Sequence, residues 1–296
     1  MSSVTLAGVL GPATTPFLAD ESLDLAGFAT NLRTHLAQGL AGIVVCGSTG
    51  ESALLDEQER GTLLSAAREV VPPGKLLLMG TGAESTRQCV ARCRDAAARG
   101  ADAVLVVAPH SYGPQMTTEA LRAHYQRVAD ESPVPVILYN IPKYMHFKLT
   151  PELVAELAQH PNLIGIKDSS GDLALLEGYL ASQGPAFTVL TGNGGQLLPA
   201  LERHARGGIV AVSLFAGGLS MDVYDAFRGG DLARAAAAQE RLKPMASTIV
   251  AGLGVAGVKA ALDAVGLVGG PVRQPLMPLG AEQLQAVEAL MVPAAV

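Results

Sequence analysis

The chain has 296 residues, of which 49% are hydrophobic and 16% charged, and its formal net charge is -6 at pH 7. This length suits one large α/β barrel with an extension. The acidic balance, without a basic stripe, argues against nucleic acid as a partner. The apolar segments are cut by glycine and proline, and none reaches the roughly 18 uninterrupted apolar residues of a membrane span. We therefore expect small-molecule partners and no membrane insertion.

The start of the chain and its cysteines restrict the cellular setting. Residues 1–5 show no basic segment followed by an apolar core and a cleavage site, so we expect no secretory leader and a cytoplasmic protein. Cys46, Cys89 and Cys93 form neither a disulfide framework nor a zinc pattern. The excess of apolar residues over polar surface predicts an oligomer.

Eight apolar runs of strand length recur along the chain, at residues 8–15, 42–46, 76–80, 103–108, 135–140, 163–167, 187–191 and 208–213. The segments between them show apolar residues every three to four positions, which predicts helices at residues 23–36, 57–70, 86–98, 119–129 and 151–158, among others. Glycines end several of these helices, and Pro151 suits a first helical turn after Thr150 as N-cap.

Continuous Val/Ile/Leu strands alternating with amphipathic helices predict a parallel sheet covered by helices. Eight such units favour a closed (β/α)8 TIM barrel, with an open doubly wound sheet as the alternative. After residue 217 only helical patterns follow, at residues 221–226, 232–245, 255–265 and 281–290. We therefore expect a catalytic barrel over residues 1–217 and a C-terminal helical extension over residues 218–296.

Lys167 is the one lysine of six that ends an apolar strand. Burial removes hydration from an ammonium, so it favours the neutral amine that attacks a carbonyl carbon to form an imine. The alternative is a snorkelling lysine, or one paired with Asp168.

Two further strand ends carry polar groups that suit imine chemistry. Tyr139 ends the fifth strand, and neighbouring barrel strands lie about 4.8 Å apart, so its phenol can meet Lys167. Ser48 and Thr49 follow the second strand in a glycine-flanked turn whose hydroxyls and backbone N–H groups suit a carboxylate. Each feature alone could be a structural anchor or a capped turn. Together they predict a nucleophilic amine, an acid/base and a carboxylate site.

These motifs resemble the dihydrodipicolinate synthase and N-acetylneuraminate lyase superfamily over nearly the whole chain. The resemblance rests on Gly47-Ser48-Thr49-Gly50-Glu51, Tyr139-Asn140-Ile141-Pro142 and Gly165-Ile166-Lys167-Asp168, in that order. It extends to Thr15-Pro16-Phe17, Gly80-Thr81-Gly82 and Arg273-Gln274-Pro275-Leu276-Met277-Pro278-Leu279.

The resemblance implies a pyruvate Schiff base on Lys167, with Tyr139 as proton relay. It assigns Ser48 and Thr49 to positions that hold the pyruvoyl carboxylate and pass protons, and we expect the next residue, Gly50, to bind substrate too. Val210 falls where the family's eighth strand lines the pyruvate pocket. The resemblance also implies a homotetramer arranged as a dimer of dimers, and a reaction that needs no metal or nucleotide cofactor.

Departures from the family pattern narrow the expected substrate. Tyr144 stands where dihydrodipicolinate synthases carry an arginine for the second substrate's carboxylate, and a neutral phenol cannot make that bidentate contact. Ser111 stands where the family often places a relay tyrosine, and whether Tyr112 or His110 substitutes is open. The loop Thr191-Gly192-Asn193-Gly194-Gly195 lacks the acidic pair of sialic-acid lyases. We expect substrate contacts from Tyr144, Tyr112, Ser111 and Gly192.

The resemblance therefore predicts a class I aldolase nearest the 4-hydroxy-2-oxoglutarate aldolase branch, cleaving or forming a 4-hydroxy-2-oxo acid. The alternatives are 4-hydroxy-tetrahydrodipicolinate synthase, a 2-oxo-3-deoxy sugar acid aldolase or dehydratase, and a non-catalytic barrel that binds a 2-oxo acid. The six histidines are scattered, with no metal-ligand spacing, which argues against a metal-dependent aldolase.

Overall fold

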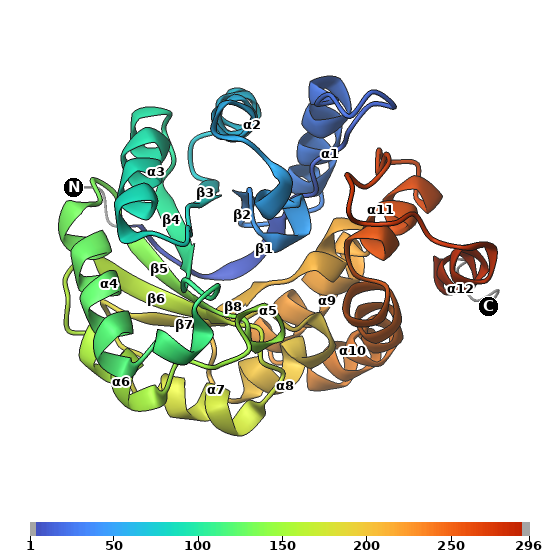
Figure 1. Ribbon diagram of the computed structural model, residues 1–296. Coiled ribbons are helices and arrows are strands. Elements are labelled where there is room, and N and C mark those ends of the chain that lie inside the picture. The colour runs from blue at the N-terminus through green and yellow to red at the C-terminus, as the bar shows by residue number, and fades with distance from the viewer. Residues whose placement is uncertain (1–3, 292–296) are drawn as a thin grey trace.

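The computed structural model describes residues 4–291 and shows a closed barrel of eight parallel strands in sequential order, β1 to β8. Residues 1–3, which are part of the start for which we expect no secretory leader, lie outside this range, as do residues 292–296 of the expected extension. Helices surround the barrel, and the C-terminal helices gather on one side of it (Figure 1). The (β/α)8 prediction is confirmed, and the open-sheet alternative is wrong.

The strands are short and almost entirely buried. Their bounds are β1 Gly8–Pro12, β2 Gly42–Val45, β3 Leu76–Gly80, β4 Ala103–Val107, β5 Val136–Asn140, β6 Leu163–Asp168, β7 Thr188–Thr191 and β8 Gly207–Ile209. Because both faces of such a strand meet apolar neighbours, the sequence shows continuous Val/Ile/Leu runs and no alternation.

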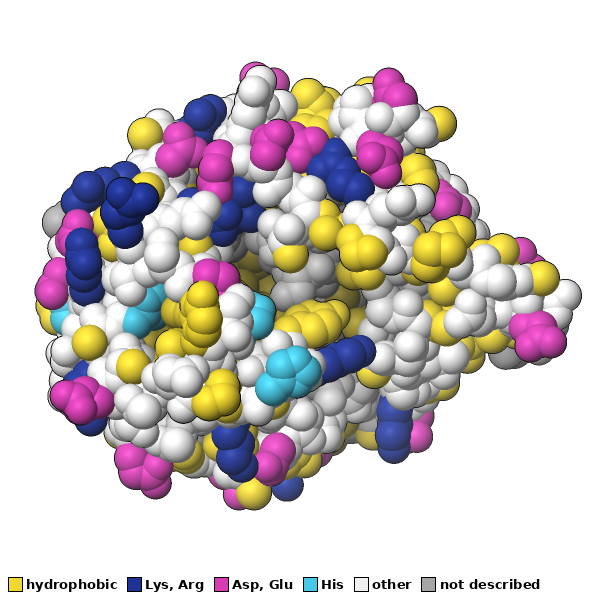
Figure 2. Space-filling model, viewed as in Figure 1, with side chains coloured by type: hydrophobic (Ala, Val, Ile, Leu, Met, Phe, Trp, Pro, Cys, Tyr) yellow, Lys and Arg dark blue, Asp and Glu magenta, His cyan; other side chains and the backbone are white. Residues whose placement is uncertain are grey.

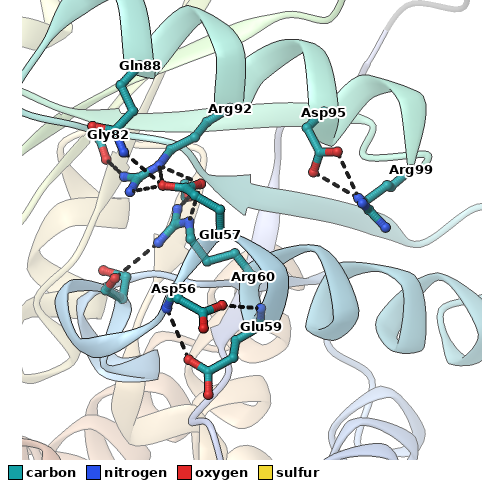
Figure 3. Close-up of polar contacts among 11 residues, drawn as sticks. Asp56, Glu57, Glu59, Arg60, Gly82, Gln88, Arg92, Asp95 and Arg99 are labelled. Carbon is teal, nitrogen blue, oxygen red and sulfur yellow. Dashed lines mark hydrogen bonds and ion pairs between the residues drawn. The ribbon is translucent and has the colours of Figure 1, made fainter.

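The helices follow the strands in the expected order. They are α1 Leu25–Ala37, α2 Glu57–Val70, α3 Thr86–Ala98, α4 Thr118–Glu131, α5 Pro142–Met145, α6 Pro151–Leu157, α7 Leu173–Leu180 and α8 Leu197–Glu202. Side-chain caps fix several starts: Asp56 accepts from the backbone N–H of Glu59, whose carboxylate accepts from the N–H of Asp56, a capping box at α2 drawn in Figure 3.

The C-terminal part is helical, as expected from the sequence. It comprises α9 Gly217–Arg228, α10 Leu232–Met245, a π-helical segment Ala246–Gly252, α11 Gly254–Ala264 and α12 Ala281–Met291. α12 lies outermost (Figure 1). These helices share a second apolar core with α8 and the turn after β8, next to the main core of the barrel.

The predicted eighth strand is wrong beyond Ile209. The carbonyl of Val210 accepts both the backbone N–H of Ser213, at 3.1 Å, and its hydroxyl, at 2.7 Å. These bonds turn the chain into a 3₁₀ helix, Ala211–Leu214. An apolar run alone does not distinguish a strand from such a turn.

Candidate active site

A cavity of about 300 Å³ opens at the carboxyl ends of the strands and is bounded on one side by the π-helical segment and α11. Figure 2 shows the molecule hollowed in the middle of this face, with hydrophobic side chains along the edge of the hollow. Six of the predicted site residues line the cavity: Ser48, Thr49, Tyr139, Tyr144, Lys167 and Gly192. The carboxyl face is where barrel enzymes place their chemistry.

Lys167 and Tyr139 are direct neighbours in the barrel wall. The parallel register of β5 and β6 pairs the two residues, and the Lys167 Nζ atom lies 4.2 Å from the centroid of the Tyr139 ring. Lys167 is 6% exposed and Tyr139 5%, so only their cavity-facing atoms meet solvent. The Lys167 amine can therefore be reached by a small carbonyl compound through the cavity.

Gly192, at the end of β7, leaves the space that the Lys167 side chain occupies. A Cβ atom added at Gly192 would lie 3.0 Å from the Lys167 Cε atom and 1.9 Å from the Ser169 Oγ atom. The strand end can therefore pack against the lysine stem only because this residue has no side chain.

The end of β6 is held by a buried hydrogen-bond network behind Lys167. The Asn140 side-chain amide donates to Asp168 Oδ1 at 2.7 Å, and its oxygen accepts from the backbone N–H of Leu149 at 3.0 Å. Ser170 donates its hydroxyl to Asp168 Oδ2 at 2.7 Å. Burial raises the pKa of Asp168, against the effect of these donors. Among the described residues the Asp168 carboxylate is thus bonded to Asn140 and Ser170, and not paired with Lys167.

Ser48 and Thr49 lie in a 3₁₀ turn, Ser48–Gly50, directly after β2. The turn is closed by the Gly50 N–H, which donates to the Gly47 carbonyl at 3.0 Å. Thr15 donates its hydroxyl to the Gly50 carbonyl at 2.7 Å. A turn that presents two side-chain hydroxyls to a cavity holding an amine can bind a carboxylate.

Four predicted residues lie outside the cavity wall. Val210 is fully buried, and its neighbours Ile209 and Ala211 contact the cavity instead. Gly50 is buried, and its carbonyl accepts from the Thr15 hydroxyl. Tyr112 is 69% exposed, and Ser111 shares its loop with His110. The backbone N–H groups of His110 and Ser111 donate to the Glu84 carboxylate at 3.1 and 2.8 Å.

Sequence reasoning missed several cavity residues. Lys143 lines the mouth and donates to the Ala251 carbonyl at 3.0 Å, which joins the loop after β5 to the π-helical segment. The C-terminal part contributes an apolar wall that includes Val250 and Val255. Lys143 could have been found from the sequence, because it directly follows the motif Tyr139-Asn140-Ile141-Pro142. No local sequence pattern identifies the residues of the π-helical segment.

The cavity suits chemistry at a carbonyl carbon. Its lining includes the amines of Lys143 and Lys167, two phenols and four serine or threonine hydroxyls, and none of the described residues contributes a carboxylate to it. Within residues 4–291, no group of three or more His, Cys, Asp or Glu side chains is arranged to hold a metal ion, and no helix is long and apolar enough to cross a bilayer. The fold and the site together define a TIM-barrel protein equipped for imine formation.

Comparison with known proteins places the chain in a family. Residues 5–293 match the dihydrodipicolinate synthetase family. Curated relatives include 4-hydroxy-tetrahydrodipicolinate synthase from Methanoculleus marisnigri, 37% identical over 91% of this chain and 92% of the relative. A second is 4-hydroxy-tetrahydrodipicolinate synthase 1 from Streptomyces coelicolor, 39% identical over 88% and 85%. The chain belongs to the dihydrodipicolinate synthetase family.

Solved structures agree with this assignment. Dihydrodipicolinate synthase DapA-2 from Bacillus anthracis superposes with a TM-score of 0.93, at 28% identity over 98% of both chains. A prophage protein of the dihydrodipicolinic acid synthase family from E. coli K12, in complex with pyruvate, gives 0.92, at 30% identity over 97% of this chain and 98% of the other. The protein is therefore an enzyme, a carbon–carbon lyase of a family that works through a Schiff base.

Proposed function

We propose that the protein is a pyruvate-dependent class I aldolase in which Lys167 forms the Schiff base. The observation that carries this proposal is the single cavity in which the Lys167 amine meets Tyr139, with the Ser48–Gly50 turn in the same wall. The amine attacks the carbonyl carbon of pyruvate, and loss of water gives the imine. Ser48 and Thr49 hold the carboxylate of the 2-oxo acid.

Carbon–carbon bond chemistry then proceeds through an enamine. A proton leaves the pyruvyl methyl group, the enamine carbon attacks an aldehyde, and the resulting alkoxide takes up a proton. Hydrolysis of the imine releases a 4-hydroxy-2-oxo acid, and the reverse sequence cleaves it. Tyr139 carries these protons, because its phenol adjoins the amine and shares its cavity. No step requires a metal or a nucleotide cofactor.

The proposed substrate is a 4-hydroxy-2-oxo acid, and Tyr144 is the residue that supports this choice. The phenol lines the cavity where a guanidinium would bind a second carboxylate in a bidentate manner. Burial raises the pKa of Tyr144, so the group is neutral near pH 7. Together with the apolar wall of Val250 and Val255, this favours an aldehyde with a weakly polar substituent.

A second candidate is the activity for which the curated relatives are named. The relatives from Methanoculleus marisnigri and Streptomyces coelicolor are called 4-hydroxy-tetrahydrodipicolinate synthases. Lys143 supports this candidate, since its ammonium lies at the cavity mouth beside Tyr144. The product has seven carbons, so pyruvate would combine with a four-carbon amino-acid semialdehyde.

One experiment tests the Schiff base and a second separates the candidates. Borohydride reduction with pyruvate should add a stable mass to Lys167 in the wild type and none in Lys167→Ala. A wild type without the adduct would exclude the mechanism. Pyruvate release from a panel of 4-hydroxy-2-oxo acids should exceed pyruvate consumption with the four-carbon semialdehyde. Faster pyruvate consumption with the semialdehyde than pyruvate release from the panel would assign the synthase activity.

We propose that the protein works as a homotetramer.

A further inference from the structure

Glu51 joins the Ser48–Gly50 turn to the C-terminal part of the chain. Its Oε1 atom lies 2.5 Å from the Nζ atom of Lys259 on α11. Its Oε2 atom accepts from the backbone N–H of Arg273 at 2.9 Å. The Glu51 and Lys259 side chains are 0% and 2% exposed. This is a fully enclosed ion pair between segments more than 200 residues apart.

Glu51 ends the Ser48–Gly50 turn, and its backbone lies in the left-handed region. Its φ of 55° lies in the left-handed region, which costs a residue with a side chain of the order of 1 kcal/mol or more. Its N–H donates to the Ser48 carbonyl at 3.2 Å, and its own carbonyl accepts from Leu54 at 2.8 Å. Rotation at Glu51 would therefore re-aim the two hydroxyls of Ser48 and Thr49.

The Lys259 ammonium is itself fixed in place. It donates to the Pro271 carbonyl at 2.6 Å and lies 4.5 Å from the centroid of the Phe17 ring. Val258, the preceding residue, lines the cavity. Lys259 thus links the cavity wall of α11 to the turn on β2.

A buried ion pair adds little to stability compared with apolar residues of the same volume, because desolvation offsets the attraction. Breaking it leaves one charge buried without a partner, which is strongly unfavourable. The pair therefore makes one arrangement of the turn far more favourable than others.

We propose that Glu51 and Lys259 are positioning residues that hold the Ser48–Thr49 turn in the geometry that binds the substrate carboxylate. The inference rests on the proposed function only in taking that turn as the carboxylate site. Neither side chain lines the cavity. Their effect therefore reaches the substrate through the turn.

Lys259→Met and Glu51→Gln test the proposal. The yield of borohydride-trapped adduct is measured at graded pyruvate concentrations, and the half-saturating concentration is taken as the KM for pyruvate. In both variants KM should rise roughly tenfold or more while the adduct yield at saturating pyruvate stays near the wild-type value. Lys259→Arg, which keeps the charge, should recover part of the loss. If Lys259→Met fails to fold, Glu51→Gln decides, because it is isosteric.

Glu59→Gln is the matched control. Arg273 makes a two-pronged contact to Glu59, with N–O distances of 2.8 and 2.7 Å, at the same junction. Loss of this Arg273–Glu59 contact should lower the melting temperature of the protein and leave the KM for pyruvate unchanged. An unchanged KM in Glu51→Gln, or an equal rise in Glu59→Gln, would overturn the positioning role. Failure of the wild type to trap pyruvate would instead refute the proposed function.

Discussion

The Lys167 Nζ atom lies over the face of the Tyr139 ring, 4.2 Å from its centroid, with both side chains nearly enclosed. The contact has two separable parts: the ring packs against the amine, and the hydroxyl belongs to the cavity wall. A substitution that removes only the hydroxyl can therefore test proton transfer without altering the packing.

Tyr139→Phe should lower turnover by roughly 10²-fold, the usual effect of losing a positioned acid/base. Adduct trapping on Lys167 should persist, because the ring that packs against the amine remains. Steady-state kinetics and mass spectrometry of the trapped protein measure the two effects separately. Unchanged turnover would remove Tyr139 from the mechanism.

Gly192→Ala should slow imine formation by roughly 10- to 100-fold, because the new methyl group would displace the Lys167 stem and Ser169. The rate of borohydride-trapped adduct formation measures this effect. Gly195→Ala is the control in the same loop, since a Cβ atom there would meet nothing closer than 3.3 Å. Equal rates in the two variants would show that Lys167 does not depend on the space at Gly192.

The barrel was readable from the sequence because its strands are buried on both faces and appear as continuous apolar runs. Lys167 and Tyr139 could be proposed because each lies at the end of such a run, and Ser48 because it lies in the turn after one. The Glu51–Lys259 pair could not be predicted, because it joins a turn to a helix far along the chain. Nothing in the sequence near Lys259 distinguishes it from a lysine on a helix surface. The end of β8 was predicted wrongly because the hydroxyl and the backbone N–H of Ser213, which both donate to the Val210 carbonyl, stop the strand, and hydrophobicity does not reveal this.

Tyr144→Arg should change which aldehyde the enzyme prefers. A guanidinium at this position can bind a carboxylate through two parallel hydrogen bonds, so KM for an aldehyde bearing a carboxylate should fall roughly tenfold. KM for pyruvate and for a neutral aldehyde of similar size should stay the same, because the Ser48–Gly50 turn is untouched. An equal change for both aldehydes would mean that Tyr144 does not contact the aldehyde substituent.

Two buried histidines should make the protein less stable in mild acid. His35 and His124 are 1% and 5% exposed, and burial lowers the pKa of each from 6.5 to about 4. Both rings are therefore neutral in the folded protein above pH 4, whereas the unfolded chain binds a proton at each below pH 6.5. The unfolded state gains protons first, so the free energy of unfolding falls as pH decreases from 6.5 to 4, by about 3 kcal/mol per histidine.

Urea unfolding at pH 7.5, 6, 5 and 4.5 measures this loss. His35→Leu should flatten the slope, because His35 is buried and its Nδ1 atom has no hydrogen-bond partner among the described residues. His146→Asn is the control: the residue is exposed and has a φ of 62°, a conformation that asparagine tolerates, so the slope should be retained. A wild type equally stable at pH 7.5 and 4.5 would mean that both buried rings accept protons without unfolding, which their enclosure argues against.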